Sequence, residues 1–453
     1  MNPPRPDPEP CFDPGELSPA AGLALRLRRL AGDRALRRFA GELREERCKV
    51  EDPAPWVAAA LGLADSREAA PKAFRRAERT LRRLRKLPSA ERESAIRSGL
   101  GGAANPALPV LLVEEAQRQL GADPRAALAW LDLGDASVHE LRADRFPECA
   151  LAPHRSRLAA HRANALRVLG ELPAAGRIFR ALAADPGRGA VAHLGDLAEL
   201  ASLEASLRIG QRRWGAAEEL LGKAARAYAA GGDGVGVAKV LLKRGTVAEY
   251  SGASAAALGL YRKATEQLDP EAEPVLFLYS LHNQANALVD AGHAAEAQRI
   301  LRTYECHFEL HCDGVNRLRR QWTEGRIARA EARFDEAAIA FDEVCTGFLA
   351  LQRPYDAALV LLDAAELRRA RGRWSEVKSL AGRLEAVFAV RGVHAEARKA
   401  LILFQEAARG EALTAEFIAG LRQYLLIGRN DPRFRFDAAR PAGRRGGCRE
   451  LRG

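Results

Sequence analysis

The sequence is poor in the residues that build sheets, membrane spans and disulfide frameworks. Aromatic residues make up only 6% of the 453 residues, and the strand formers Val, Ile, Thr and Tyr are scarce, whereas Ala, Leu, Arg and Glu dominate. The longest apolar runs, 107–113 and 357–362, are far shorter than the roughly 20 residues that cross a bilayer. The sequence therefore predicts an all-α protein without a membrane span, and disfavours β-sandwiches, barrels and Rossmann-type sheets.

The sequence also shows no disulfide pattern and no secretory signal. The seven cysteines are odd in number and follow no regular spacing, which suits a reducing compartment better than a disulfide scaffold. The N-terminal segment MNPPRPDPEP is Pro-rich and has no apolar core, so we expect no secretory signal. Both observations lead us to expect a cytoplasmic protein.

Positive charge is concentrated near the two ends of the chain. The formal net charge is +11, yet the long middle is nearly neutral. The sharpest feature is a predicted helix over 72–86, in which apolar residues occupy one face and basic residues the other. Such a face can contact a phosphate backbone or an acidic partner, or it can simply be solvated. Its basic residues, opposed only by Glu78, are Lys72, Arg75, Arg76, Arg79, Arg82, Arg83, Arg85 and Lys86.

The strongest signal in the sequence is internal repetition. A short motif with a turn residue, an apolar residue and a closing small residue recurs, and its last position falls at 175, 217, 257, 297, 337 and 377, at spacings of 42, 40, 40, 40 and 40. Four positions later stands Phe179, Leu221, Tyr261, Leu301, Phe341 or, as the weak copy, Ala381. Before the turn, most units place a small residue at 163, 245, 285, 325 or 365.

This pattern predicts antiparallel helix pairs. Small residues let two helices approach closely, the turn glycine ends the first helix, and the large residue fills the space against the next pair. One pair cannot bury its apolar face alone, so neighbouring pairs must stack into a solenoid.

The arrangement resembles the tetratricopeptide repeat, in a form with repeats of about 40 residues. The resemblance covers 155–385, with a looser earlier unit over 108–131 and capping helices around 393–408 and 415–426. It implies a right-handed α-α superhelix with a concave groove. Three stretches, 320–327, 355–363 and 431–436, also resemble uncharacterised bacterial repeat proteins, some of which carry an N-terminal helix-turn-helix.

Four segments are predicted along the chain. Residues 1–21 form a disordered Pro-rich tail, 22–104 a small helical N-terminal region, 105–430 the solenoid with its capping helices, and 431–453 a basic disordered tail. Within the N-terminal region, 53–63 resembles the closing helix of a phage-repressor type helix-turn-helix. The turn and the base-contacting residues of that motif are not recognisable between Phe39 and Val50, so a degenerate remnant or an inert cap is the alternative.

No catalytic motif stands out, and we expect neither an enzyme nor a cofactor. One cluster, Cys306, His307, His311 and Cys312, has soft-metal ligand chemistry. Its members have difficulty converging from one helix, and the alternative is an ordinary repeat helix, so no metal site is predicted.

The resemblance also implies a binding surface, because the first helix of each tetratricopeptide unit lines the groove that usually holds a partner peptide. Asn can bond a peptide backbone and Arg a carboxylate. The family's carboxylate clamp is incomplete, since Ala160 and Leu203 stand where Lys and Asn are required. The expected function is a regulatory scaffold that binds a protein or peptide; the alternative is a transcriptional regulator with an N-terminal DNA-binding domain. The groove positions carried over are Arg157, Asn164, Arg167, Lys239, Lys243, Glu249, His282, Asn283, Asn286, Arg319, Arg326 and Arg329.

Overall fold

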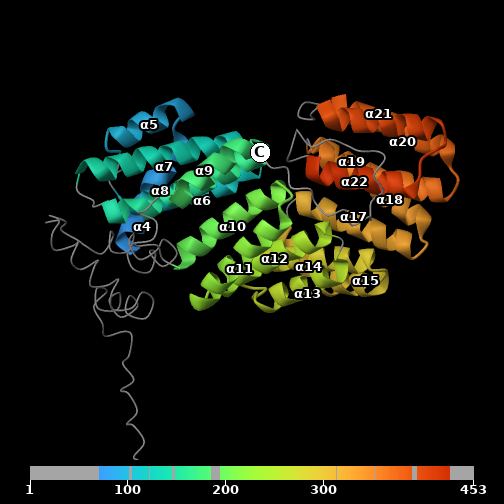
Figure 1. Ribbon diagram of the computed structural model, residues 1–453, viewed down its shortest axis with the longest axis horizontal. Helices are drawn as coiled ribbons and strands as arrows, with labels where there is room; N and C mark the ends of the chain where they lie inside the picture. The colour runs from blue at the N-terminus through green and yellow to red at the C-terminus, as the bar shows by residue number, and fades with distance from the viewer. Residues whose placement is uncertain are drawn as a thin grey trace, which may run out of the picture. The chain divides into compact units, whose positions relative to one another are not determined.

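The computed structural model describes residues 71–100, 105–121, 123–144, 148–184, 194–251, 253–312, 314–351, 353–389 and 395–428. Every regular element in these ranges is an α-helix (Figure 1). The predicted tails 1–21 and 431–453 and the helix-turn-helix resemblance at 53–63 lie outside the described residues. None of the described helices combines the length and apolar character needed to cross a bilayer.

The chain divides into two compact units. Unit 1 comprises residues up to 166 together with 173–203, and unit 2 comprises 167–172 and 204 onward. This division falls inside the predicted segment 105–430, and the predicted segment boundaries stay predictions.

Unit 1 is built on antiparallel helices around a core of Leu, Val and Ala side chains. The predicted pair over 108–131 is present as α6 and α7, and the shorter helices α4 and α5 pack on α6 and α7 respectively. The helices of this unit are α4 (Pro71–Lys86), α5 (Ser89–Arg97), α6 (Ala107–Leu120), α7 (Pro124–Asp144), α8 (Glu148–Val168), α9 (Leu172–Ala184) and the first part of α10 (Leu194–Gly210).

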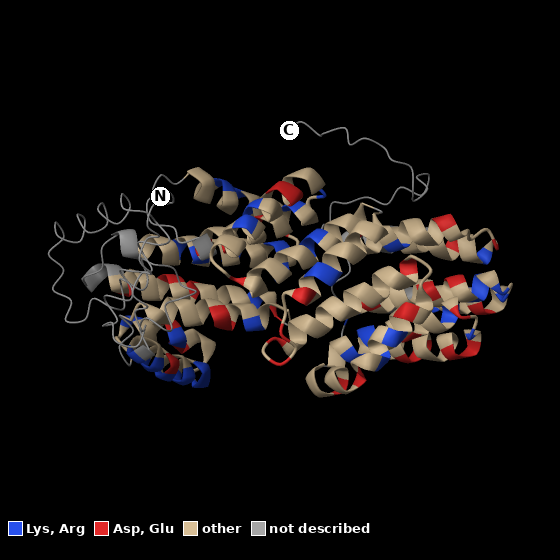
Figure 2. Ribbon diagram, turned by 90° about the horizontal axis from the view of Figure 1, so that it is seen from below, with Lys and Arg blue, Asp and Glu red and all other residues tan. Residues whose placement is uncertain are grey.

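Unit 2 continues with helix pairs that repeat at a fixed interval. The helices beginning at 214, 234, 254, 274, 294, 314, 334, 354 and 374 start 20 residues apart, so each pair spans 40 residues as predicted. Both basic and acidic residues are spread over the helices (Figure 2), in keeping with the near-neutral middle of the chain. The helices are α11 (Trp214–Ala230), α12 (Gly234–Tyr250), α13 (Ser254–Glu266), α14 (Pro274–Asp290), α15 (Ala294–Thr303), α16 (Glu305–His311), α17 (Gly314–Ala330), α18 (Phe334–Ala350), α19 (Pro354–Ala370), α20 (Trp374–Ala389), α21 (Ala395–Arg409) and α22 (Ala415–Gly428).

The tight turns between helices depend on left-handed backbone conformations. Gly170, Gly292 and Gly372 have φ of 83°, 82° and 69°, as the predicted turn glycines require. In three turns a residue with a side chain adopts this conformation instead: Arg212 at φ 58°, Ala332 at φ 60° and Glu411 at φ 55°. The sequence motif therefore locates the turns at Arg212 and Ala332 even though glycine is absent from the strained position.

The small and large positions of the motif meet in the core. Ala217, Ala257, Ala297 and Ala337 are completely buried. A Cβ placed on Gly245 would lie 2.2 Å from Cε1 of Tyr261, and one on Gly325 would lie 2.9 Å from Cε1 of Phe341. In unit 2 an aromatic residue thus stands opposite a glycine, whereas the alanine at 285 has an aliphatic residue, Leu301, at the corresponding position.

One second helix departs from the regular pattern. The helix that begins at Ala294 ends at Thr303, and α16 follows after a break at Tyr304, where φ is −109° and ψ is 21°. At the end of the chain α21 and α22 occupy the places of the predicted capping helices, and α22 packs against α19.

Candidate functional site

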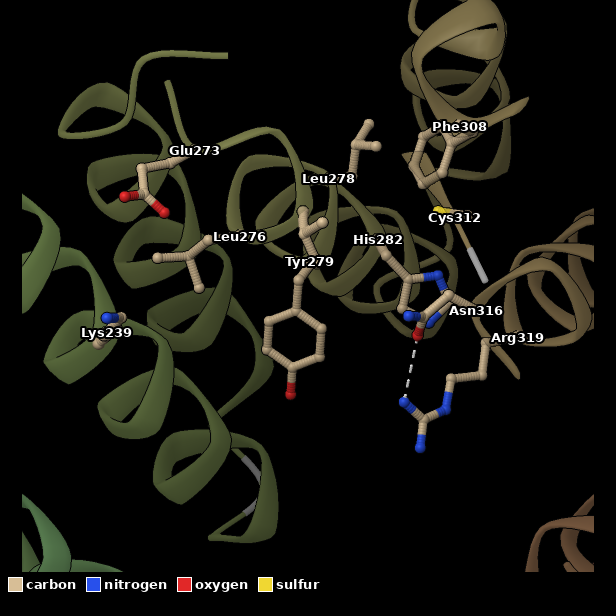
Figure 3. A pocket seen from close by; sticks show the side chains of 11 residues that line it. Lys239, Glu273, Leu276, Leu278, Tyr279, His282, Phe308, Cys312, Asn316 and Arg319 are labelled. Atoms are coloured by element: carbon tan, nitrogen blue, oxygen red, sulfur yellow. Dashed lines mark hydrogen bonds between the residues drawn. The ribbon is translucent and has the colours of Figure 1, made fainter. Parts of the chain in front are cut away.

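The first helices of three successive pairs, α12, α14 and α17, supply most of the lining of a pocket in unit 2. The pocket has a volume of about 420 Å³, within the range of sites that take a small ligand or a few side chains of a peptide. The helix α16 and the residue after it complete one wall (Figure 3). The lining residues are Lys239, Glu273, Val275, Leu276, Leu278, Tyr279, His282, Phe308, Cys312, Asn316 and Arg319.

The apolar part of the pocket comes from α14 and α16. Leu278 and Phe308 are buried, whereas Val275 is 58% and Tyr279 42% exposed. Val275 and Tyr279 are one helical turn apart and therefore lie on the same face of α14. Two large apolar side chains left open to solvent beside a pocket are the kind of feature that marks a binding surface.

Two cations line the same pocket without an acidic partner. Lys239 is exposed and forms no ion pair with any described residue. Arg319 donates one hydrogen bond, to Oδ1 of Asn316 at 3.4 Å, and forms no ion pair among the residues that the structure describes. Other arginines of α17, by contrast, are held in ion pairs. The pocket therefore combines an apolar surface with two positive charges that form no ion pair, and with one carboxylate, that of Glu273.

A hydrogen-bonded chain fixes the state of His282 at the edge of the pocket. Oδ1 of Asn286 accepts bonds from Arg326 at 2.8 Å and from Thr323 at 3.1 Å. The amide nitrogen of Asn286 is then free to donate to Nε2 of His282, 2.9 Å away, which places the ring proton on Nδ1. Burial, together with the positive charges of Arg319 and Arg326, lowers the pKa of His282 to about 3, so the imidazole is neutral at physiological pH.

Glu249, a carboxyl group near this hydrogen-bonded network, has a pKa that is raised and not lowered. Burial raises the pKa of Glu249 to about 7; Tyr261 and Arg326 oppose the rise, and the negative charge of Asp290 adds to it. Arg326 also donates a hydrogen bond to Asp290. Glu249 therefore changes charge near neutral pH, in the last turn of a helix that lines the pocket.

We expect Glu249→Gln to remove a pH dependence of stability. A carboxyl whose pKa is raised on folding stabilises the protein below its unfolded pKa, and that contribution is lost as pH rises through about 7. The variant mimics the protonated form, so at pH 8 its free energy of unfolding should exceed that of the unchanged protein by on the order of 2 kcal/mol. Near pH 4.5 the two should be equal. Urea unfolding at both pH values measures this, with the exposed Glu266→Gln as control; a constant difference between the proteins would contradict it.

Several residues expected in the groove are engaged in contacts within the protein. Arg326 bonds Asn286 and Asp290, and Arg329 bonds Asp363 at 3.3 Å and Glu366 at 3.0 Å. Lys239, His282 and Arg319 instead line the pocket, while Lys243 and Asn283 are half-buried nearby in sequence. Three of the expected residues of unit 2 therefore line one pocket. Others form hydrogen bonds and ion pairs between neighbouring helices.

The expected residues of α8 belong mainly to unit 1. Nε of Arg157 donates to Glu199 at 2.7 Å, and His161 lies 3.1 Å from the same carboxylate. Burial alone would raise the pKa of Glu199, but Arg157 and His161 hold it well below its usual range. Asn164 is buried and Arg167 half-buried.

The cysteine and histidine cluster does not form a metal-binding group. Cys306 is exposed, and Nε2 of His307 lies 4.0 Å from Glu271. Among the described residues, no three His, Cys, Asp or Glu side chains gather as a metal site. Cys312 lines the pocket instead.

The apolar half of this pocket was not predicted from the sequence. Val275 and Tyr279 precede His282 at helical spacing, so the face that carries the predicted polar residues already contained them. Phe308 and Cys312 could not be placed in this way, because they reach the pocket through the break at Tyr304.

Comparison with known proteins supports the fold. No protein-family model matches the chain, and no curated protein matches it. The fold is similar to that in the crystal structure of a Rap protein complexed with Competence and Sporulation Factor, with a TM-score of 0.54 over 72% of this chain and 89% of that chain. The identity is 12%, so the likeness concerns the fold alone. Together with the stacked helix pairs, it confirms the predicted fold class, an all-α superhelix of the tetratricopeptide type.

Proposed function

We propose that this chain is a non-enzymatic regulatory scaffold of the long-repeat tetratricopeptide kind that binds a segment of a protein or peptide on the first helices of unit 2. The observation that carries the proposal is the pocket of three consecutive first helices, with Lys239 and Arg319 unpaired beside Val275 and Tyr279. A tetratricopeptide-like array is suited to this role, because stacked pairs present side chains from successive units along one surface. We place the protein in the cytoplasm.

The chemistry of the pocket defines the kind of segment that fits. Lys239 and Arg319 can each pair with a carboxylate, and Val275 and Tyr279 can cover an apolar side chain. The neutral His282 can offer its Nδ1 proton to a carbonyl oxygen of the bound backbone. The segment that fits is therefore extended, acidic and apolar. The solved Rap structure contains the Competence and Sporulation Factor, and its fold likeness is compatible with binding on such a surface.

The test is selection of peptides on the immobilised full-length protein from a random displayed library, followed by fluorescence anisotropy with the enriched peptide. We expect enrichment of acidic peptides with a large apolar residue. The double variant Lys239→Glu, Arg319→Glu should weaken binding at least about tenfold, because two charge-assisted contacts are replaced by repulsion.

The matched control is Lys263→Glu, Arg299→Glu, which makes the same charge change at exposed positions on two second helices. It should bind the peptide as the unchanged protein does. Failure to enrich any peptide, or equal loss of binding in both double variants, would refute binding at this pocket.

A further inference from the structure

Unit 1 carries a second surface with different chemistry, on helix α4. The apolar face of this helix is part of the core: Phe74 and Leu81 are 4% exposed and Leu84 is completely buried. The helix packs against α6, and Nδ2 of Asn105 donates to the carbonyl oxygen of Ala73 at 2.8 Å. Because one face is fixed in this way, the other face must be presented to solvent.

The exposed face of α4 is almost entirely cationic. Arg85, at its edge, forms an ion pair with Glu115 on α6, with Nη2 of Arg85 2.5 Å from Oε2 of Glu115. Nε of Arg82 donates to the carbonyl oxygen of Glu78 at 3.4 Å. This acceptor is neutral, so the positive charge of Arg82 is not balanced by it. No ion pair joins any described residue to the seven basic side chains that form the rest of this face, which we call the α4 ridge: Lys72, Arg75, Arg76, Arg79, Arg82, Arg83 and Lys86. The concentration of basic residues can be followed in Figure 2.

The α4 ridge is compact and regular. At 100° and 1.5 Å per residue, its seven positions fall within an arc of about 120° and along about 21 Å of helix. Seven like charges so close together repel one another, and a solvated face gains nothing from this arrangement. A ligand that brings a dense, regular row of negative charges would relieve the repulsion.

Duplex nucleic acid carries such a dense, regular row of negative charges. It carries one phosphate charge per roughly 1.7 Å of its axis, so a ridge of this length spans many phosphates. Arginine, which supplies five of the seven cations, bonds phosphate oxygens through two parallel donors.

Two other polyanions fit less well. An anionic membrane surface is bound by helices whose apolar face enters the lipid, but the apolar face of α4 is buried in unit 1. None of the large apolar side chains that the structure leaves exposed lies on this helix. An acidic protein surface seldom provides so many carboxylates in a continuous row, since side-chain carboxylates are separated by uncharged residues.

The α4 ridge also lacks the amide and hydroxyl side chains that would complement arginine in reading a defined base sequence. Amide and hydroxyl side chains make the base-edge contacts that complement arginine, and Thr80, the sole hydroxyl residue of α4, is 1% exposed. Phosphate contacts position a protein on a duplex without distinguishing its sequence.

We propose that the α4 ridge binds the phosphate backbone of duplex nucleic acid independently of sequence. This surface belongs to unit 1, and the proposal does not depend on peptide binding in unit 2.

The experiment uses the full-length protein and two fluorescein-labelled DNA duplexes of unrelated sequence, each about 20 base pairs long. Fluorescence anisotropy between about 50 and 200 mM salt should give equal affinities for the two duplexes and a steep, linear fall of log K with log salt, of slope about −4 to −6 if five or six phosphates are neutralised. The variant Arg75→Glu, Arg79→Glu, Arg82→Glu should bind at least about 30-fold more weakly and reduce that slope by about 3. All three side chains are exposed, and thermal melting of the variant checks that it folds as the unchanged protein does.

The control variant Arg440→Glu, Arg444→Glu, Arg445→Glu makes the same change in the basic segment 435–453 and should retain both affinity and slope. Loss of binding in this control alone, or equal binding by the α4 variant and the unchanged protein, would overturn the assignment. Tighter binding to polyglutamate, or to vesicles containing phosphatidylserine, than to DNA would also overturn it and identify the competing class of partner.

Discussion

Replacing Asp363 with Ala should lower the free energy of unfolding of unit 2 by about 3–5 kcal/mol, because it removes the anion from a buried group of donors. Asp363 is completely buried. Its carboxylate accepts hydrogen bonds from Nε1 of Trp322 at 2.7 Å, from Arg422 at 2.5 Å and from Arg329 at 3.3 Å. The substitution leaves the two guanidinium groups partly buried, and among the described residues their remaining ion pairs are with Glu366.

Urea unfolding, followed by tryptophan fluorescence and circular dichroism, measures this loss. Asp335→Ala serves as the control, since Asp335 is 85% exposed and its ion pair with Arg371 lies at the surface; it should cost less than about 1 kcal/mol. If both substitutions lowered the free energy of unfolding by the same amount, the buried contacts of Asp363 would stabilise the protein no more than a surface ion pair does.

The same contacts should make Asp363 a source of acid sensitivity. Burial would raise its pKa, but Arg422, with smaller contributions from Arg326 and Arg329, lowers it to about 2. A carboxyl whose pKa is depressed on folding contributes stability above its unfolded pKa, and that stability is lost as pH falls through the folded value. The difference between the unchanged protein and Asp363→Ala should therefore be full at pH 5 and shrink between about pH 4 and pH 2.

Gly245→Ala should destabilise the protein although alanine favours helices. The added methyl group would lie 2.2 Å from the ring of Tyr261, which is completely buried. Overpacking of this kind costs about 1–3 kcal/mol, which exceeds the gain of up to about 1 kcal/mol in helix propensity. Thermal and urea unfolding should both report a less stable protein.

Two further variants separate the clash from other effects of the substitution. Gly259 also lies in a helix, but a Cβ there meets nothing within 4 Å, so Gly259→Ala should stabilise slightly. The double variant Gly245→Ala, Tyr261→Leu recreates the pairing of Ala285 with Leu301 and should recover part of the loss caused by Gly245→Ala. The two single substitutions each change the free energy of unfolding, and the sum of these changes is the reference. A double variant less stable than this sum predicts would disprove steric complementarity between positions 245 and 261.

The repeating part of the fold could be predicted because its contacts are local and periodic. Ala257 and Ala337 are buried where the 40-residue phase placed them, and Tyr261 and Phe341 fill the core four residues later. Small and large residues at fixed spacing have one efficient packing in a stacked helix pair, so pattern alone determined these positions. The turns followed for the same reason, even at Arg212 and Ala332, where the residue type gave no indication of a left-handed backbone.

The candidate site could be predicted only in part, because its properties depend on contacts between units of the array. Arg319, Arg326 and Arg329 stand on one helix and were indistinguishable by spacing. Arg326 and Arg329 are paired with acidic residues of α14 and α19, and only Arg319 lines the pocket without a carboxylate. The break at Tyr304, which brings Phe308 to the pocket, contains neither proline nor glycine and so left no local signal.

The constant interval between helix starts in unit 2 means that the number of helix pairs in the array can change. Excising or duplicating any 40 residues between equivalent starts joins a turn to a helix as the native chain does, so local geometry survives a change in array length. The stretch from α12 to α17 is the exception, because its helices supply the residues that line the pocket. Among the described repeats, the length of the array can therefore change only outside α12 to α17 if the pocket is to be kept.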